Sequence, residues 1–114
     1  MGLRIDRRDE GDSTELALGG DLDLETSAAL RQALLAVIGE SQARHVVVDL
    51  EGVDFIDSAG LGVLLGGRER ARDADGDLVL VATGRNVLRV LELTGLDRVF
   101  EIHVSRASAR GAGG

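Results

Sequence analysis

The sequence predicts an α/β domain in which helices cover a mostly parallel five-stranded sheet that begins with a β-hairpin. The chain has 114 residues, which suits one domain with one core. Predicted elements follow the order β-β-α-β-α-β-α-β, and a helix between two strands is typical of parallel pairing. Apolar residues make up 44% of the chain and aromatic residues only 2%, so we expect a core of closely packed aliphatic side chains.

The first two strands are predicted from alternation along the chain. Leu3 and Ile5 alternate with charged residues, and Leu16 and Leu18 lie two apart in the same manner after a turn-like segment at 9–13. Alternation with a period of two places one face of a strand on a core and the other in water. These strands are therefore expected to form a half-buried hairpin at one side of the sheet.

Two further strands are predicted from nearly continuous aliphatic runs at 46–50 and 78–82. Such runs are typical of strands that are covered on both faces. A last edge strand is predicted where three apolar residues alternate with Glu101 and His103. These residues are Phe100, Ile102 and Val104.

The helices are predicted from apolar residues that recur at three- and four-residue steps. The first is expected over about 24–38, with Asp23 as its cap and Gly39 as its stop. The second and third are expected over about 59–72 and 85–94. We expect the domain to comprise residues 1–104. The segment 105–114 has no apolar period and is expected to be a disordered tail.

Composition excludes several functions. Thirteen basic residues against 20 acidic ones give a net charge of -7, which repels nucleic acid and anionic membranes. All the basic residues are arginines and there is no cysteine, which excludes a Walker-A lysine, a Schiff base, a thiol nucleophile and a zinc–thiolate site. No apolar run approaches the roughly 20 residues that span a bilayer. We expect a cytoplasmic protein without a membrane or nucleic-acid partner.

Residues 49–65 depart from the local rules of helix formation. The helix they lead into carries four glycines, each of which costs up to about 1 kcal/mol relative to alanine. They are Gly60, Gly62, Gly66 and Gly67. A helix with such a sequence is expected to need a close backbone approach, either to its own sheet or to a docked partner.

Ser58 follows a predicted loop and precedes the helical pattern, which is typical of an N-cap residue. Capping alone would account for a serine at this position. A phosphoryl group there would add roughly -1.5 to -2 charges. The helix N-terminus would favour this anion, whereas Asp54, Asp57 and, across the sheet end, Asp21 and Asp23 would oppose it. The modified chain would keep its fold and present a different surface.

The segment 49–65, with Asp57-Ser58-x-Gly60-Leu61 at its centre, resembles the signature of the STAS domain of bacterial anti-sigma factor antagonists. Three other stretches resemble the same family, and they are 20–23, 87–91 and 94–96. The resemblance spans residues 3–104. It departs from the family in the segment 105–114, which lacks the amphipathic final helix that such domains often carry.

The resemblance implies a regulatory protein without catalytic activity, metal or cofactor of its own. In this family an anti-sigma factor that is also an ATP-dependent serine kinase phosphorylates the antagonist, and a separate serine phosphatase removes the phosphate. The unmodified antagonist binds the anti-sigma factor and releases the sigma factor, and phosphorylation ends that binding. By resemblance, Ser58 is the phosphoacceptor, Asp57 is its acidic neighbour, and Asp21 and Asp23 form the acidic loop nearby.

The helix that follows Ser58 supplies the other candidate partner-binding residues. Their exposed sides are expected to form a docking face, although packing in the core would also account for the leucines. The residues are Gly60, Leu61, Val63 and Leu64.

The sequence also suggests two alternative functions, another role within the STAS family and nucleotide binding. Members of the STAS family also serve as subunits of lipid-transport systems or as adaptors in stress-signalling complexes, and the intact Ser58 favours the sigma-factor switch. The spacing of Gly60, Gly62 and Gly66 invites a nucleotide-binding interpretation. Against it, a seven-residue loop is expected before the helix, and the next strand ends at 82–84 without an acidic residue.

A metal-dependent site is the remaining alternative. Asp49, Asp54 and Asp57 together suggest a receiver-type aspartyl phosphorylation site with a magnesium ion. Receiver domains place a lysine opposite the acceptor, and this chain has none. We therefore expect no metal site.

Overall fold

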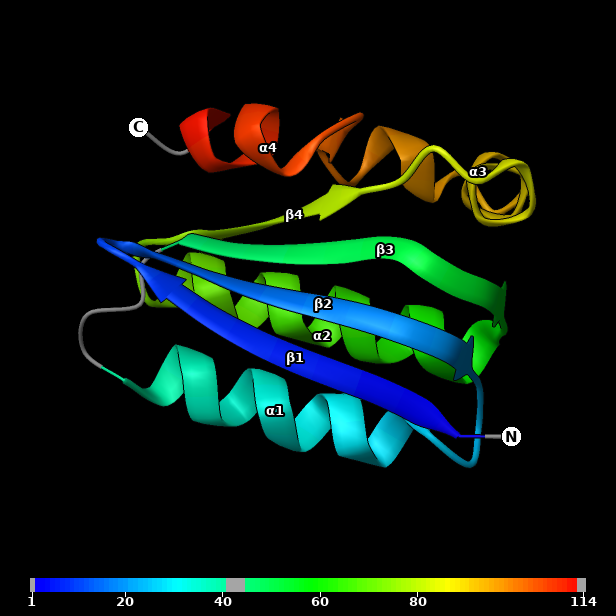
Figure 1. Ribbon diagram of the computed structural model, residues 1–114, viewed down its shortest axis with the longest axis horizontal. Coiled ribbons are helices and arrows are strands. Elements are labelled where there is room, and N and C mark those ends of the chain that lie inside the picture. Colours follow the sequence, from blue (N-terminus) through cyan, green and yellow to red (C-terminus); the bar gives the residue numbers. More distant parts are fainter. Residues whose placement is uncertain (1, 41–44, 113–114) are drawn as a thin grey trace.

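The computed structural model describes residues 2–40 and 45–112. Its five strands form one sheet in the order β1-β2-β3-β4-β5 (Figure 1). β1 pairs with β2 in antiparallel fashion, and the other three pairs are parallel. The strands are β1 (Leu3–Glu10), β2 (Ser13–Leu22), β3 (His45–Ile56), β4 (Asp77–Val81) and β5 (Ile102–His103). The predicted α/β fold with its N-terminal hairpin is confirmed.

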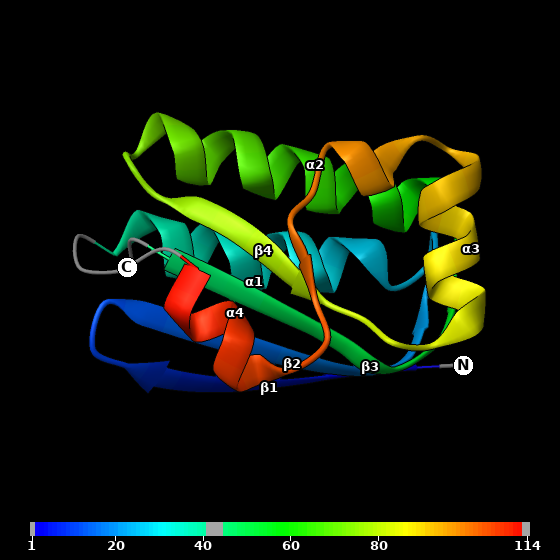
Figure 2. The same ribbon diagram turned by 90° about the horizontal axis from the view of Figure 1, so that it is seen from above.

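Helices lie on both sides of the sheet. α1 and α2 run side by side along one face, and α4 lies on the opposite face (Figures 1 and 2). α3 lies at the carboxyl end of β3 (Figure 2). The helices are α1 (Ser27–Gly39), α2 (Ser58–Asp73), α3 (Arg85–Leu93), the short 3-10 helix η1 (Leu96–Arg98) and α4 (Arg106–Ala112). Among the described helices, none has the length and apolar character needed to cross a bilayer.

The aliphatic runs are covered on both faces, as predicted. Alternate residues of β3, such as Val46 and Val48, join the main core under α1 and α2. Val47 points the other way and packs with Val79 and Val81 under α4. Helices therefore cover both faces at the centre of the sheet, and the loops that follow the parallel strands lie at the carboxyl ends of those strands.

Three predicted boundaries are wrong. α1 begins at Ser27 rather than at residue 24, because the Asp23 carboxylate holds the preceding turn by accepting hydrogen bonds from the Glu25 and Thr26 amides. The last strand contains only Ile102 and His103, and Val104 is 75% exposed. The seven-residue loop does not exist, since β3 runs on to Ile56.

The extension of β3 depends on its pairing with β2. The register between the two strands shifts twice, near Gly19 and again near Asp21, and pairing then continues to Leu22 and Ile56. Such irregularities let a strand bend while it keeps its partner. As a result the end of β3 leads directly into α2.

The expectation of a disordered tail is wrong over α4. Ala109 is fully buried against the valines of β3 and β4. Arg106 binds the buried Glu15 carboxylate with its Nη1 at 2.8 Å, and its Nε lies 3.7 Å from the Asp49 carboxylate. The hydrogen bond to Glu15 raises the pKa of the Arg106 guanidinium above its ordinary value. The Arg106 ion pair, the buried Ala109 and a hydrogen bond between His45 Nε2 and the Ala109 carbonyl at 3.0 Å thus hold this helix without an amphipathic period. Residues 113–114 lie outside the described residues.

We expect Arg106→Ala to loosen α4. The second Glu15 oxygen already has no partner in the described part of the chain, so this substitution leaves a whole buried carboxylate unpaired. Hydrogen exchange should accelerate at the Ala109 amide, which donates to the Ser105 carbonyl. Arg98→Ala, at an exposed arginine on η1, is the control that should leave this exchange rate unchanged. Unchanged exchange in Arg106→Ala would contradict the ion pair's role.

Candidate functional site

The candidate site lies where β3 passes into α2, and Asp57 forms its framework. Asp57 has an extended backbone, and its Oδ1 accepts hydrogen bonds from the amides of Ala59 at 2.9 Å and Gly60 at 3.1 Å. These contacts define an N-cap. The prediction that Ser58 caps the helix is therefore wrong, and Ser58 is the first helical residue.

Asp57 also fastens the loop between β2 and α1 to the start of α2. Its Oδ2 accepts a hydrogen bond from the Leu24 amide at 3.1 Å, and its own amide donates to the Leu22 carbonyl at 3.2 Å. One carboxylate thus joins the β2–α1 loop to the start of α2, 33 residues later in the sequence. The loop cannot move away from the start of α2 unless these bonds break.

The loop has internal bonds of its own. The Asp23 Oδ1 accepts from the amides of Glu25 and Thr26, and the Thr26 hydroxyl donates to the Asp21 carbonyl at 2.8 Å. The structure therefore brings Asp21, Asp23 and Asp57 to one end of the sheet. The carboxylates of Asp23 and Asp57 are engaged with backbone amides, which identifies them as groups that shape the site.

The Ser58 side chain is exposed, and its hydroxyl makes no hydrogen bond within the described part of the chain. The cap at Asp57 satisfies the next two amides, so the helix does not need this hydroxyl. A modification at Ser58 would therefore change the surface charge and leave the hydrogen bonds of the helix start intact.

Close packing against the rest of the chain explains two of the four glycines of α2 and does not explain the other two. A Cβ at Gly60 would lie 2.6 Å from the Leu22 Cγ and 2.9 Å from the Leu22 carbonyl oxygen. A Cβ at Gly67 would lie 2.9 Å from the Leu34 Cδ1. Close internal packing accounts for both positions. Gly62 has nothing within 4 Å of such a Cβ, and the same is true of Gly66.

The predicted docking face on α2 is wrong for three of its four residues. Leu61 is 6% exposed and Leu64 is fully buried, and both belong to the main core. Gly60 is buried where α2 approaches β2. The reason is that this side of α2 faces the sheet. Val63 is half-buried and lines a groove between α1 and α2.

Two exposed apolar residues near Ser58 were missed. Leu24 is 76% exposed in the β2–α1 loop, and Phe55 is 51% exposed near the end of β3, where it pairs with Asp21. The sequence signal for Leu24 is its position between two acidic residues, outside the apolar period of α1. Exposed large apolar side chains beside a polar site are typical of a binding surface.

The structure bears on the nucleotide-binding and metal-binding alternatives. Because β3 reaches Ile56, the loop that argued against nucleotide binding is absent. The other argument against it remains, since residues 82–84 after β4 contain no acidic residue. Within residues 2–40 and 45–112, no three histidine or carboxylate side chains are grouped as metal ligands.

Comparison with known proteins places this geometry in a family. A family model described as the STAS domain matches residues 4–109. A relative from Paenibacillus polymyxa, an anti-sigma F factor antagonist, is 29% identical over 109 residues, which are 96% of this chain and 93% of the relative. An anti-sigma-B factor antagonist from Staphylococcus aureus is 28% identical over 103 residues, or 90% of this chain and 94% of that protein.

A solved structure agrees with these sequences. The crystal structure of an anti-sigma factor antagonist from Mycobacterium paratuberculosis matches with a TM-score of 0.88 at 31% identity, covering 97% of this chain and 93% of that one. The match therefore includes α4 as well as the sheet. With the family model matching most of its length, this chain belongs to the STAS domain family.

Proposed function

We propose that this protein is an anti-sigma factor antagonist that is switched by phosphorylation of Ser58. The unphosphorylated chain binds an anti-sigma factor that is also a serine kinase, and this binding releases the sigma factor. Phosphorylation of Ser58 ends the binding, and a serine phosphatase restores it. On this proposal the chain is a cytoplasmic binding partner and kinase substrate, and it has no catalytic role.

One observation carries the proposal: Ser58 is exposed, and its hydroxyl has no hydrogen-bond partner in residues 2–40 and 45–112, while Asp57 caps the helix. A kinase can reach that hydroxyl without unfolding the helix. Relatives and a neighbouring structure that carry the name anti-sigma factor antagonist match nearly the whole chain, which supports the same function.

The physical basis of the switch is charge at a packed surface. A phosphoryl group adds roughly -1.5 to -2 charges at neutral pH. The nearest carboxylate, Asp57, is already used by three amides and remains in place. A partner that covers Leu24 and Phe55 would have to bury this added charge beside Asp57, so the complex would weaken while the antagonist kept its fold.

The partner can be captured first and then used as the probe. Immobilised Ser58→Ala chain is incubated with an extract of the native cells, and a captured protein qualifies if it phosphorylates the wild-type chain with ATP. Phosphopeptide mapping should then find the phosphate on Ser58, and the Ser58→Ala chain should remain unlabelled. Phosphate only at another residue would contradict the assignment.

Ser58→Asp should weaken binding of the purified kinase by roughly tenfold or more, because it places a charge at the interface. Ser58→Ala should bind like the wild type. Ser105→Asp is a matched control, since it adds the same charge at an exposed serine on the α4 side of the sheet. Isothermal titration calorimetry measures all four affinities. Equal affinities of Ser58→Asp and the wild type would disprove the switch.

A further inference from the structure

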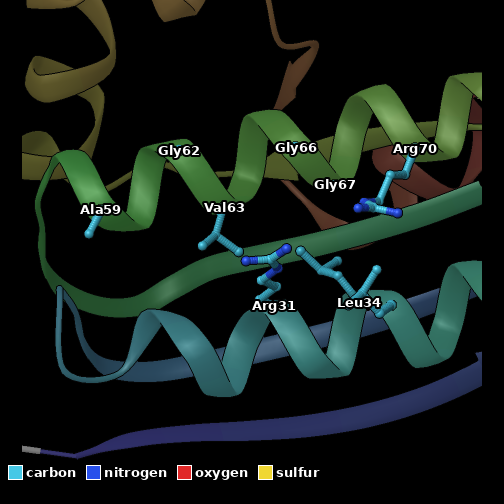
Figure 3. A pocket seen from close by; sticks show the side chains of 9 residues that line it. Arg31, Leu34, Ala59, Gly62, Val63, Gly66, Gly67 and Arg70 are labelled. Atoms are coloured by element: carbon cyan, nitrogen blue, oxygen red, sulfur yellow. The ribbon is translucent and has the colours of Figure 1, made fainter.

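A groove runs between α1 and α2 and begins at Ala59, the residue that follows Ser58 (Figure 3). Its first part has a volume of about 300 Å³ and extends from Ala59 to Arg70 on α2. A second hollow of about 310 Å³ shares Leu35 and Arg70 with the first and continues to Ala74. At a rise of about 1.5 Å per helical residue, the groove is roughly 22 Å long.

Two arginines make this groove positive in an otherwise acidic protein. Arg31 on α1 and Arg70 on α2 point into the space between the helices (Figure 3). Neither guanidinium has a carboxylate partner in residues 2–40 and 45–112. Asp73 at the far end is the one carboxylate residue that lines the two hollows. The groove therefore suits an anionic occupant, although the chain has a net charge of -7.

The wall on the α2 side is smooth. Gly62 and Gly66 are four residues apart, and both line the first part of the groove. A Cβ at either position would meet no atom within 4 Å, so packing within the chain does not account for the cost of a glycine in a helix. With no side chains there, another backbone can approach α2 closely. Val63 and Leu34 add apolar surface.

We propose that this groove binds a helical segment of the anti-sigma factor that carries apolar side chains on one face and carboxylates that pair with Arg31 and Arg70. The proposal rests on the proposed function. A protein segment fits better than a small molecule because the groove extends over about four turns of α2, a length that suits an amphipathic helix. Two arginines on opposite walls favour acidic side chains on the segment.

The position of the groove couples it to the switch. Its near end is lined by Ala59, the residue that follows Ser58. A phosphoryl group on Ser58 would lie one residue before this end and would repel the same carboxylates that Arg31 and Arg70 attract. The acidic segment would thus respond to phosphorylation even where it does not touch the serine.

Charge reversal tests the proposal with the purified kinase captured as described above. The double variant Arg31→Glu, Arg70→Glu should weaken binding by roughly tenfold or more. The matched control is Arg8→Glu, Arg98→Glu, which changes the net charge equally at two exposed arginines outside the groove. We expect the control to change the affinity by less than about threefold. Circular dichroism checks that both variants fold.

The outcomes separate this proposal from the proposed function. If the groove variant binds like the wild type while Ser58→Asp does not, the groove proposal is overturned and the switch stands. If Ser58→Asp binds like the wild type, the proposed function fails and this inference fails with it. If the groove variant and its control lose affinity equally, general electrostatics explains the loss and the groove proposal is again overturned.

Cross-linking identifies the segment directly. The chain has no cysteine, so Leu35→Cys in the groove and Leu24→Cys beside Ser58 each give a unique attachment point for benzophenone maleimide. From position 35 we expect a cross-linked partner peptide with carboxylates at helical spacing, and replacing them with lysines should restore binding to the charge-reversed variant. A peptide without carboxylates, or cross-linking from position 24 only, would overturn the proposal.

Discussion

Gly60→Ala is expected to lower the free energy of unfolding by about 2–3 kcal/mol, whereas Gly62→Ala should raise it by up to about 1 kcal/mol. The added methyl at residue 60 would lie 2.9 Å from the Leu22 carbonyl oxygen and closer still to the Leu22 side chain. That carbonyl also accepts the hydrogen bond of the Asp57 amide, so moving it disturbs the site as well as the core. At residue 62 the methyl meets open space.

The two variants form a matched pair because they introduce the same group into the same helix, two residues apart. Urea denaturation followed by circular dichroism gives both free energies. Gly66→Ala is a second control and should behave like Gly62→Ala, since its added methyl also has nothing within 4 Å. A destabilisation at residue 62 as large as that at residue 60 would show that contacts with Leu22 are not the cause.

Asp57→Ala is expected to lower the free energy of unfolding by about 2 kcal/mol. The substitution removes the two hydrogen bonds that cap α2. It also removes the hydrogen bond from the Leu24 amide, which holds the β2–α1 loop. Asp57→Asn keeps an oxygen for the cap but replaces the second oxygen with a donor, so it should lose about half as much. Urea denaturation measures stability, and hydrogen exchange at Leu24 reports on the loop.

Asp54→Ala is the control for the loss of a carboxylate near the site. Asp54 is exposed and makes no hydrogen bond or ion pair within residues 2–40 and 45–112, so its replacement should change stability by less than about 0.5 kcal/mol. If Asp57→Ala were equally mild, and exchange at Leu24 stayed slow, contacts other than this carboxylate would have to join the β2–α1 loop to the start of α2.

The elements that depend on local pattern were predictable. Alternation identified the hairpin, and the aliphatic runs identified strands covered on both faces, because each signal is contained in a few consecutive residues. The length of β3 was not predictable, because its last residues are in a strand only through their pairing with β2. α4 was missed for a similar reason. Its ion pair joins Arg106 to Glu15, 91 residues earlier.

The candidate site was predictable in its location and not in its detail. Asp57 and Ser58 are both good capping residues, and only the backbone of the folded chain selects the first of them. Leu61 and Leu64 belong to the segment 49–65 that resembles the STAS signature, yet they lie on the side of α2 that faces the sheet and are buried. Arg31 and Arg70 carry no mutual signal in the sequence, because the groove forms only when α1 and α2 lie side by side.

Because Asp57 caps α2 and Ser58 does not, the two positions should differ in how they tolerate substitution during evolution. The Asp57 side chain caps the helix, whereas the Ser58 side chain makes no hydrogen bond within the described part of the chain. Substitution at residue 58 therefore costs the fold little. On the proposed function, a single substitution there would remove the response to the kinase and leave the domain folded. Substitution at residue 57 would instead remove three hydrogen bonds and destabilise the domain. If Ser58 is the phosphoacceptor, regulation in this domain would be easier to lose, and to regain, than the fold itself.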